Sequence, residues 1–313
     1  MAKEIRRIGV LRGMETTFVD AIVPYINENF PGKGVEAEFA QIDAIQYDET
    51  PRYRVILDRI SHEVPFYRSL LKWAALNGTY VVNNPFWWSA DDKFIDNLIA
   101  ERSGVAVPRT VLLPHKNRPP RIEAESLRNL TFPVGWDRVF EYVGFPSFLK
   151  PHDGGGWRGV TRVTDPDSFF AAYDGSGDDC MILQEGIEFT HYFRCYGIGQ
   201  EHVRIMKYNP DAEPHLRYHD VPEGQVAPKL LAKMERDVLA ICTALGYDMN
   251  TVEFAVRDGI PYAIDFMNPA PDADYHSVGH ENFDWVVKTI AAMLVEKATG
   301  SRKKQKVAPP LVA

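Results

Sequence analysis

Residues 251–266, TVEFAVRDGIPYAIDF, carry the most specific structural signal in this chain. Apolar and polar side chains alternate on both sides of a central Asp-Gly pair, a pattern typical of a β-hairpin. Successive side chains in a strand point to opposite faces, so the apolar residues share one face while Glu253 and Asp265 share the other. A two-residue turn would pair Glu253 with Ile264, whereas a three-residue loop at 258–260 would place the two carboxylates directly opposite each other. We therefore expect the three-residue loop.

The two carboxylates of this hairpin could hold a metal ion. Directly opposed strand residues have Cβ atoms about 5 Å apart. Carboxylate oxygens are ligands that Mg²⁺ prefers, with substrate phosphates completing its shell. The alternative is a solvent-exposed face that carries unrelated charges. Asn268, just past the second strand, offers a third oxygen ligand and favours the metal site.

A second informative stretch is FLKPHDGGGWRGV, residues 148–160. A strand delivers Lys150, and the glycines that follow let backbone N–H groups approach an anion closely, which suits a polyphosphate. The alternative is a flexible turn that happens to be rich in glycine. The order of residues differs from a Walker A loop, since the lysine precedes the glycines and no Gly-Lys-Ser/Thr follows.

The N-terminal part of the chain alternates apolar runs with a helical pattern. Residues 8–11, 35–39 and 55–57 are predicted strands and residues 21–26 a predicted helix, which together indicate a small α/β domain with parallel strands. No GxGxxG follows the first strand, so the dinucleotide-binding fingerprint is absent. The other predicted elements are helices at 94–99, 168–173 and 230–245, strands near Phe148 and Ile182, and a hairpin over 193–208.

Composition narrows the class of protein. A chain of 313 residues with 45% hydrophobic side chains can bury an ample core without disulfides. The net charge of −8 disfavours a general nucleic-acid or anionic-membrane binder. Three widely spaced cysteines without a CxxC fit a reduced compartment and no zinc ribbon. No window approaches the ~20 apolar residues of a membrane span. We expect a cytoplasmic protein with no nucleic-acid and no membrane partner.

The order of the lysine–glycine stretch, the carboxylate hairpin and the asparagine resembles the ATP-grasp superfamily. The likeness extends over residues 80–275 and is greatest to the carboxylate-amine ligase branch, which includes glutathione synthetase, D-alanine–D-alanine ligase and the ribosomal-protein glutamate ligases. It implies an α/β fold of the α+β grasp type, with an N-terminal pre-ATP-grasp α/β domain followed by two α+β subdomains that clamp ATP. The implied boundaries are 1–88 for the first domain, 89–186 for the central ATP-binding subdomain, 187–300 for the C-terminal subdomain and 301–313 for a solvated tail.

The resemblance also implies which residues bind ATP and magnesium. Backbone around Glu185 would hold the adenine and Glu188 the ribose, while two lysines and the glycine loop would meet the phosphates. The implied nucleotide-binding set is Lys93, Lys150, Gly154, Gly155, Gly156, Gln184, Glu185, Ile187 and Glu188. The implied metal ligands, for two Mg²⁺ ions with Mn²⁺ as an alternative, are Glu253, Asp265 and Asn268. One residue usually separates the last two ligands in the family, but two separate them here, so the match requires a bulge or a strand break at 266–267.

The function implied by the resemblance is an ATP-dependent carboxylate-amine ligase of the peptide type, which works through an acyl phosphate and releases ADP and phosphate. Its catalytic residues would be Arg194 and Lys207, which resemble basic positions that meet phosphate or the reaction intermediate. Its partners would be small-molecule or peptide carboxylate and amine substrates. The chain could also assemble as a homodimer. Residues that could contact the substrates between the domains are Arg59, His62, Arg217 and Asp272.

Two other functions stay open from the sequence. One is an ATP-grasp kinase that phosphorylates a small-molecule hydroxyl. Such a kinase would require a dense basic pocket for its acceptor, and the acidic composition of this chain argues against one. The other is a non-catalytic nucleotide-binding regulator, which would be expected to have lost a lysine or a metal carboxylate. A zinc site at His276 and His280 is disfavoured, because the sequence offers no convincing third ligand.

Overall fold

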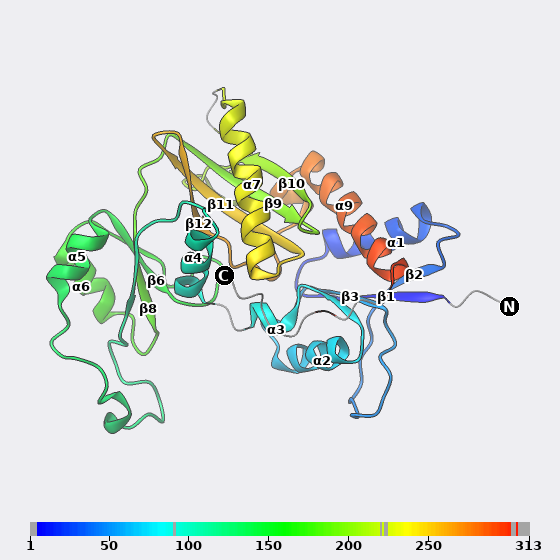
Figure 1. Ribbon diagram of the computed structural model, residues 1–313, viewed down its shortest axis with the longest axis horizontal. Coiled ribbons are helices and arrows are strands. Elements are labelled where there is room, and N and C mark those ends of the chain that lie inside the picture. The colour runs from blue at the N-terminus through cyan, green and yellow to red at the C-terminus, as the bar shows by residue number, and fades with distance from the viewer. Residues whose placement is uncertain (1–4, 90–91, 220, 222–224, 302–304, 306–313) are drawn as a thin grey trace.

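The computed structural model describes residues 5–89, 92–219, 221, 225–301 and 305. It is a mixed α/β structure with three four-stranded sheets among these residues, which confirms the predicted fold class. Figure 1 shows the first and second sheets toward opposite ends of the molecule, with the third sheet and the long helix α7 between them.

The first sheet is parallel and has the strand order β2-β1-β3-β4. The prediction of parallel strands here is therefore confirmed. The elements of this part are β1 (Arg6–Leu11), α1 (Thr17–Asn29), β2 (Val35–Phe39), β3 (Val55–Asp58), α2 (Pro65–Leu76), β4 (Tyr80–Val82) and α3 (Pro85–Trp88).

The second sheet is antiparallel, has the order β5-β8-β6-β7 and packs its apolar face on α5 and α6. Strand β6 carries the lysine that precedes the glycine loop, and β8 leads into the segment expected to bind adenine. The elements are α4 (Lys93–Arg102), β5 (Thr110–Leu113), the short 3-10 helix η1 (Ala124–Leu127), α5 (Trp136–Val143), β6 (Ser147–Pro151), β7 (Thr161–Val163), α6 (Pro166–Asp174) and β8 (Met181–Glu185).

The third sheet is also antiparallel, with the order β10-β9-β11-β12, and its apolar face packs on α7. Its elements, with the helices that follow, are β9 (His191–Ile198), β10 (His202–Lys207), the 3-10 helix η2 (Pro214–Leu216), α7 (Pro228–Leu245), β11 (Met249–Arg257), β12 (Ile260–Asp265), α8 (Tyr275–Val278) and α9 (His280–Thr299). None of the helices in the described ranges is long and apolar enough to cross a membrane.

The last helix returns to the first sheet. Helix α9 lies beside α1 in Figure 1, and its buried side chains share one core with those of α1 and β1. Residues from both ends of the chain therefore build one hydrophobic cluster. The domain boundaries expected from the sequence stay predictions.

The expected solvated tail, residues 301–313, lies outside the described residues except for Ser301 and Gln305. At Gln305 the expectation is wrong. Its side-chain amide accepts a hydrogen bond from the Val81 N–H at 2.8 Å and donates one to the Val81 carbonyl at 2.7 Å. This position pairs with the backbone of the edge strand β4 because β4 has no further strand beside it.

The hairpin of β11 and β12, over residues 251–266, closes with a two-residue turn, so the expected three-residue loop is wrong. Asp258 and Gly259 both have positive φ, 53° and 73°, which is the conformation of a type I′ turn. Glu253 nevertheless lies directly opposite Asp265, because the register shifts beside Glu253 and leaves Ile264 as an extra residue. A β-bulge thus achieves the opposition that the longer loop was expected to provide.

Candidate active site

A cavity of about 930 Å³ lies where the second and third sheets meet. It brings together most of the residues singled out in the sequence, from the glycine loop, the ends of β6 and β8, and the cavity-facing side of β9, β11 and β12. The predicted site residues on its wall are Lys93, Lys150, Gly154, Gly155, Gly156, Gln184, Glu185, Ile187, Glu188, Arg194, Arg217, Glu253, Asp265, Asn268 and Asp272.

The opposed carboxylates of the hairpin have different electrostatic environments. Burial raises the pKa of Glu253, an effect that the nearby charge of Asp265 reinforces and that Arg194 opposes. Burial also acts to raise the pKa of Asp265, but the positive charges of Lys93 and Lys150 outweigh it and hold that pKa below its ordinary value. Positive charges of Lys93, Lys150 and Arg194 therefore lie around the two carboxylates, an arrangement that suits a polyphosphate bound together with a cation.

Asn268 reaches this centre because the strand is broken before it. Strand β12 ends at Asp265, so the alternation of side chains does not continue through the two residues that follow. The side-chain amide of Asn268 donates to the Thr251 carbonyl at 3.0 Å, which leaves its Oδ1 as an acceptor on the cavity wall. The strand break that the sequence match required is present.

These three side chains fit a hard cation that is also held by substrate phosphates. They offer two carboxylates and one amide oxygen, and Mg²⁺ is usually bound through one or two carboxylates together with phosphates. Within the described ranges no group of three His, Cys, Asp or Glu side chains could hold a metal ion. The rings of His276 and His280 both pack edge-on against Tyr275.

Two buried lysines face the carboxylates. Lys93, in the first turn of α4, donates to the Gly154 carbonyl at 2.8 Å, and its Nζ lies 3.8 Å from Asp265 Oδ1. Lys150 Nζ, on β6, donates to Gln184 Oε1 at 2.8 Å. Burial is the main cause that lowers the pKa of Lys150 to about 8, and the charge of Lys93 adds to it. Both ammonium groups therefore lie where a polyphosphate would bring compensating charge.

The segment after β8 is held by ion pairs that the sequence reading missed. The carboxylate of Glu185 lies 3.1 Å from Arg109 Nε and 2.8 Å from Arg257 Nη1. The side chain of Glu185 is thus neutralised by two arginines, and its backbone N–H donates to the Arg109 carbonyl at 2.9 Å. The next residue, Gly186, donates its N–H to the Pro146 carbonyl at 2.9 Å, which fixes the course of the segment along the cavity.

Arg194 lies directly opposite Glu253 across β9 and β11. Its Nε is 3.7 Å from Glu253 Oε1, and its Nη2 donates to Thr251 Oγ1 at 3.4 Å. Tyr192, two residues earlier on the same face, donates its hydroxyl to Glu253 and also lines the cavity. The sequence reading missed Tyr192, although the strand alternation from Arg194 places it on this face.

Lys207 is not part of this cavity, which corrects its expected catalytic role. In the register of β9 and β10 it pairs with Phe193, whose side chain is buried against α7. Lys207 instead lines a separate hollow of about 390 Å³ with Leu231 and Glu235 of α7. Strand alternation turns residue 207 to the helix-covered face, because its neighbour Met206 is the residue opposite Arg194.

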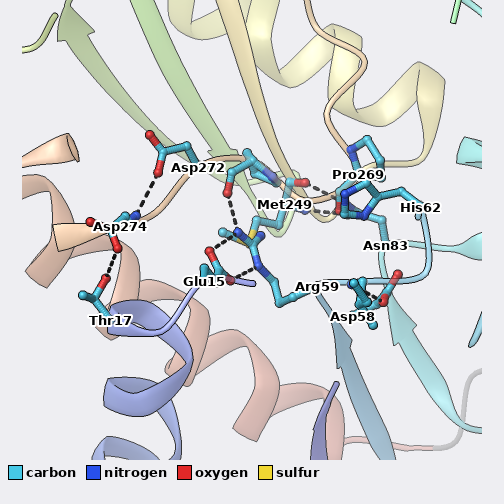
Figure 2. Close-up of polar contacts among 12 residues, drawn as sticks. Glu15, Thr17, Asp58, Arg59, His62, Asn83, Met249, Pro269, Asp272 and Asp274 are labelled. Carbon is cyan, nitrogen blue, oxygen red and sulfur yellow. Dashed lines mark hydrogen bonds and ion pairs between the residues drawn. The ribbon is translucent and has the colours of Figure 1, made fainter. Parts of the chain in front are cut away.

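Two of the expected substrate contacts also lie away from the cavity wall. Arg59 is only 4% exposed and is paired with Glu15, as Figure 2 shows, and its Nη2 also donates to the carbonyl of Pro271. His62 is exposed beside Glu63 and lines no part of the cavity. Arg59 therefore ties the first sheet to the segment after β12 and does not meet a substrate in the cavity.

Comparison with known proteins identifies the fold. No family model matches the sequence. The chain is similar to methylcrotonoyl-CoA carboxylase subunit alpha, mitochondrial, of Glycine max, with 26% identity over 128 residues. That match covers 36% of this chain and only 18% of the length of the relative.

Solved structures match almost the whole chain. D-alanine–D-alanine ligase from Bacillus anthracis, complexed with ATP, matches with a TM-score of 0.63 and 18% identity over 94% of this chain and 97% of that one. A RimK domain ATP-grasp protein from Sphaerobacter thermophilus matches with a TM-score of 0.62 and 17% identity over 94% and 100%. The ATP-grasp ligase PsnB with a minimal precursor matches with a TM-score of 0.61 and 14% identity over 91% and 99%. Since each of these likenesses covers more than nine-tenths of the chain, the chain has the ATP-grasp fold.

Proposed function

We propose that this protein is an ATP-dependent, ADP-forming carboxylate-amine ligase. The observation that carries the proposal is the convergence of Glu253, Asp265, two buried lysines and Arg194 on one cavity beside a glycine-rich loop. The names of the structural neighbours support it, since they include a D-alanine–D-alanine ligase with ATP and an ATP-grasp ligase with Mg and ADP.

In this proposal ATP lies along the cavity between the second and third sheets. Backbone of residues 185–187 holds the adenine, Glu188 the ribose, and Lys93, Lys150 and the glycine loop hold the phosphates. Glu253, Asp265 and Asn268 would hold Mg²⁺, which when bound neutralises charge on the phosphates. The lysines, together with a cation held by the opposed carboxylates, would thus offset the negative charge that otherwise repels a reacting carboxylate.

The reaction joins a carboxylate and an amine in two balanced steps. A carboxylate oxygen of the substrate attacks the γ-phosphorus, the bond to the bridging oxygen of ADP breaks, and an acyl phosphate forms. The amine then attacks the acyl carbon, phosphate leaves with the bonding pair, and the amine loses a proton as the amide forms. Arg194 stabilises the oxyanion of the tetrahedral intermediate, and Arg217 and Asp272, on the same wall, contact the substrates.

The test is ADP release by the purified protein with pooled amino acids and dicarboxylates, with and without hydroxylamine. Trapping of a hydroxamate is the expected result, because hydroxylamine attacks an acyl phosphate. ADP release that requires a polyol and yields a phosphomonoester would replace the ligase with the kinase alternative, and nucleotide binding without any turnover would favour the regulator. Lys150→Met should remove activity, whereas the matched variant Lys207→Met changes a lysine outside the cavity and should retain it.

Several finer expectations accompany the proposal. A second Mg²⁺ ion, replacement by Mn²⁺, a homodimer, the lack of a nucleic-acid partner and a cytoplasmic location stay predictions from the sequence. Dialysis against EDTA followed by titration with either metal would count the ions that restore ADP release.

A further inference from the structure

The segment 268–274, which follows β12 and carries Asn268 and Asp272, is tied to the first sheet (Figure 2). Asn83, just past β4, donates its amide to the Pro269 carbonyl at 3.0 Å. Thr17, at the start of α1, donates its hydroxyl to Asp274 Oδ2 at 2.8 Å. Side chains from the first 90 residues thus hold both ends of a segment that lines the cavity.

Arg59 holds the middle of the same segment. Its Nη2 donates to the Pro271 carbonyl at 2.6 Å and to Glu15 Oε2 at 2.7 Å, while its Nε pairs with the other oxygen of Glu15. Its Nη1 lies 3.5 Å from Met249 Sδ at the start of β11. Since the guanidinium is a rigid planar fork, these partners fix its orientation and with it the position of the carbonyl that it binds.

The burial of this arginine needs an explanation other than stability. A buried ion pair gains little over apolar side chains of similar size, because both charges lose their hydration. Arg59 lies off the cavity wall, so a substrate contact does not explain it. Arg59 instead donates to the carbonyl of Pro271, which lies between the cavity-lining residues Asn268 and Asp272 in the chain. This hydrogen bond explains the burial if its role is to hold that segment in place.

We propose that Arg59, oriented by Glu15, is a positioning residue that fixes segment 268–274 so that Asn268 presents its Oδ1 to the cavity. The inference rests on the proposed function, because it assigns Asn268 to Mg²⁺. Residues that orient metal ligands affect metal affinity although they do not touch the ion. Arg59 therefore acts on the Mg²⁺ requirement and not on the binding of metal-free ATP.

The test separates positioning from simple stability. Arg59→Met alone leaves the Glu15 carboxylate without its ion pair, so the double variant Arg59→Met/Glu15→Gln removes that charge and still lacks the donor to Pro271. Arg204→Met is the matched control, since Arg204 also joins distant elements, through Asn282 and Glu281, but within the described ranges it has no hydrogen bond or ion pair to segment 268–274. Melting temperature checks that each variant is folded.

Two readouts are measured, the Mg²⁺ concentration that half-saturates ADP release and the Mg²⁺ dependence of ATP binding by isothermal titration calorimetry. In the double variant we expect both Mg²⁺ requirements to rise about tenfold, the range seen when the partners of metal ligands are removed. ATP binding in EDTA should stay close to wild type. An unchanged Mg²⁺ requirement, or an equal rise in Arg204→Met, would overturn the inference. If the wild type forms no hydroxamate, the ligase proposal fails, whereas the calorimetric shift still decides the role of Arg59.

Discussion

Raising the pH from 7 to 9 should weaken the binding of ATP about tenfold, because it removes the proton of Lys150. Lys150 is 7% exposed and donates to two neutral acceptors, Gln184 Oε1 at 2.8 Å and the Ile264 carbonyl at 3.2 Å. No carboxylate lies within ion-pair distance of it among the described residues, whereas Asp265 pairs with Lys93 and Glu253 with Arg194. Burial therefore lowers the pKa of Lys150 to about 8.

The magnitude follows from the protonated fraction. With a pKa of about 8, roughly nine-tenths of Lys150 is charged at pH 7 and roughly one-tenth at pH 9. A polyphosphate binds the charged form, so the free protein must take up a proton at the higher pH. The apparent association constant then falls about tenfold, or about 1.4 kcal/mol, between the two pH values.

Isothermal titration calorimetry with ATP in EDTA measures this effect without an added cation. Comparing two buffers of different ionisation enthalpy reports the proton uptake directly. Lys150→Met should bind ATP more weakly at pH 7 and lose the pH dependence, while Lys207→Met should behave like the wild type because it lies on the other face of the sheet. Equal wild-type affinity at both pH values, or the same tenfold loss in Lys150→Met, would refute the assignment of this lysine to the phosphates.

Three other predictions concern the metal carboxylates, the adenine segment and a buried acid. Glu253→Gln and Asp265→Asn should each reduce Mg²⁺-dependent ADP release to background in a coupled assay while circular dichroism stays unchanged, and near-normal activity in either would remove it from the metal site. Gly186→Ala would place a Cβ 2.7 Å from the Pro146 carbonyl oxygen, so the segment must shift and the KM for ATP should rise several-fold; an unchanged KM would contradict the adenine assignment. Burial raises the pKa of Asp248 from 3.8 to about 6, so ionisation costs the folded state stability as the pH rises through this range. Between pH 3.5 and pH 7 the free energy of unfolding of Asp248→Asn, measured with urea, should therefore rise by about 3 kcal/mol relative to that of the wild type. A difference between the two proteins that does not change with pH would contradict the raised pKa of Asp248.

Local sequence patterns predicted the elements that carry the site. Strand β2 has the predicted bounds, and the hairpins over 193–208 and 251–266 occur where alternation and turn residues placed them. Helices α2, α5 and α9 were not predicted. Helix α9 buries residues over a wide arc of its circumference, because it packs on α1, on the first sheet and on side chains of the third sheet, and so it lacks the narrow apolar stripe by which a surface helix is recognised.

The site required more than local patterns. The sequence placed Glu253 and Asp265 on one face, but the bulge at Ile264 put them opposite each other. It could not exclude Lys207, because choosing the cavity face of β10 requires its register with β9.

Alternation and spacing act between near neighbours in the chain, so local patterns predicted the succession of strands along it, the two carboxylates that share a face and the lysine that precedes the glycines. Folding in three dimensions settles which of these residues meet in the cavity. The contact of Arg59 with Pro271 joins residues 212 positions apart. Such contacts depend on hydrogen-bond register and on packing between distant segments, and neither leaves a periodic signal in the sequence.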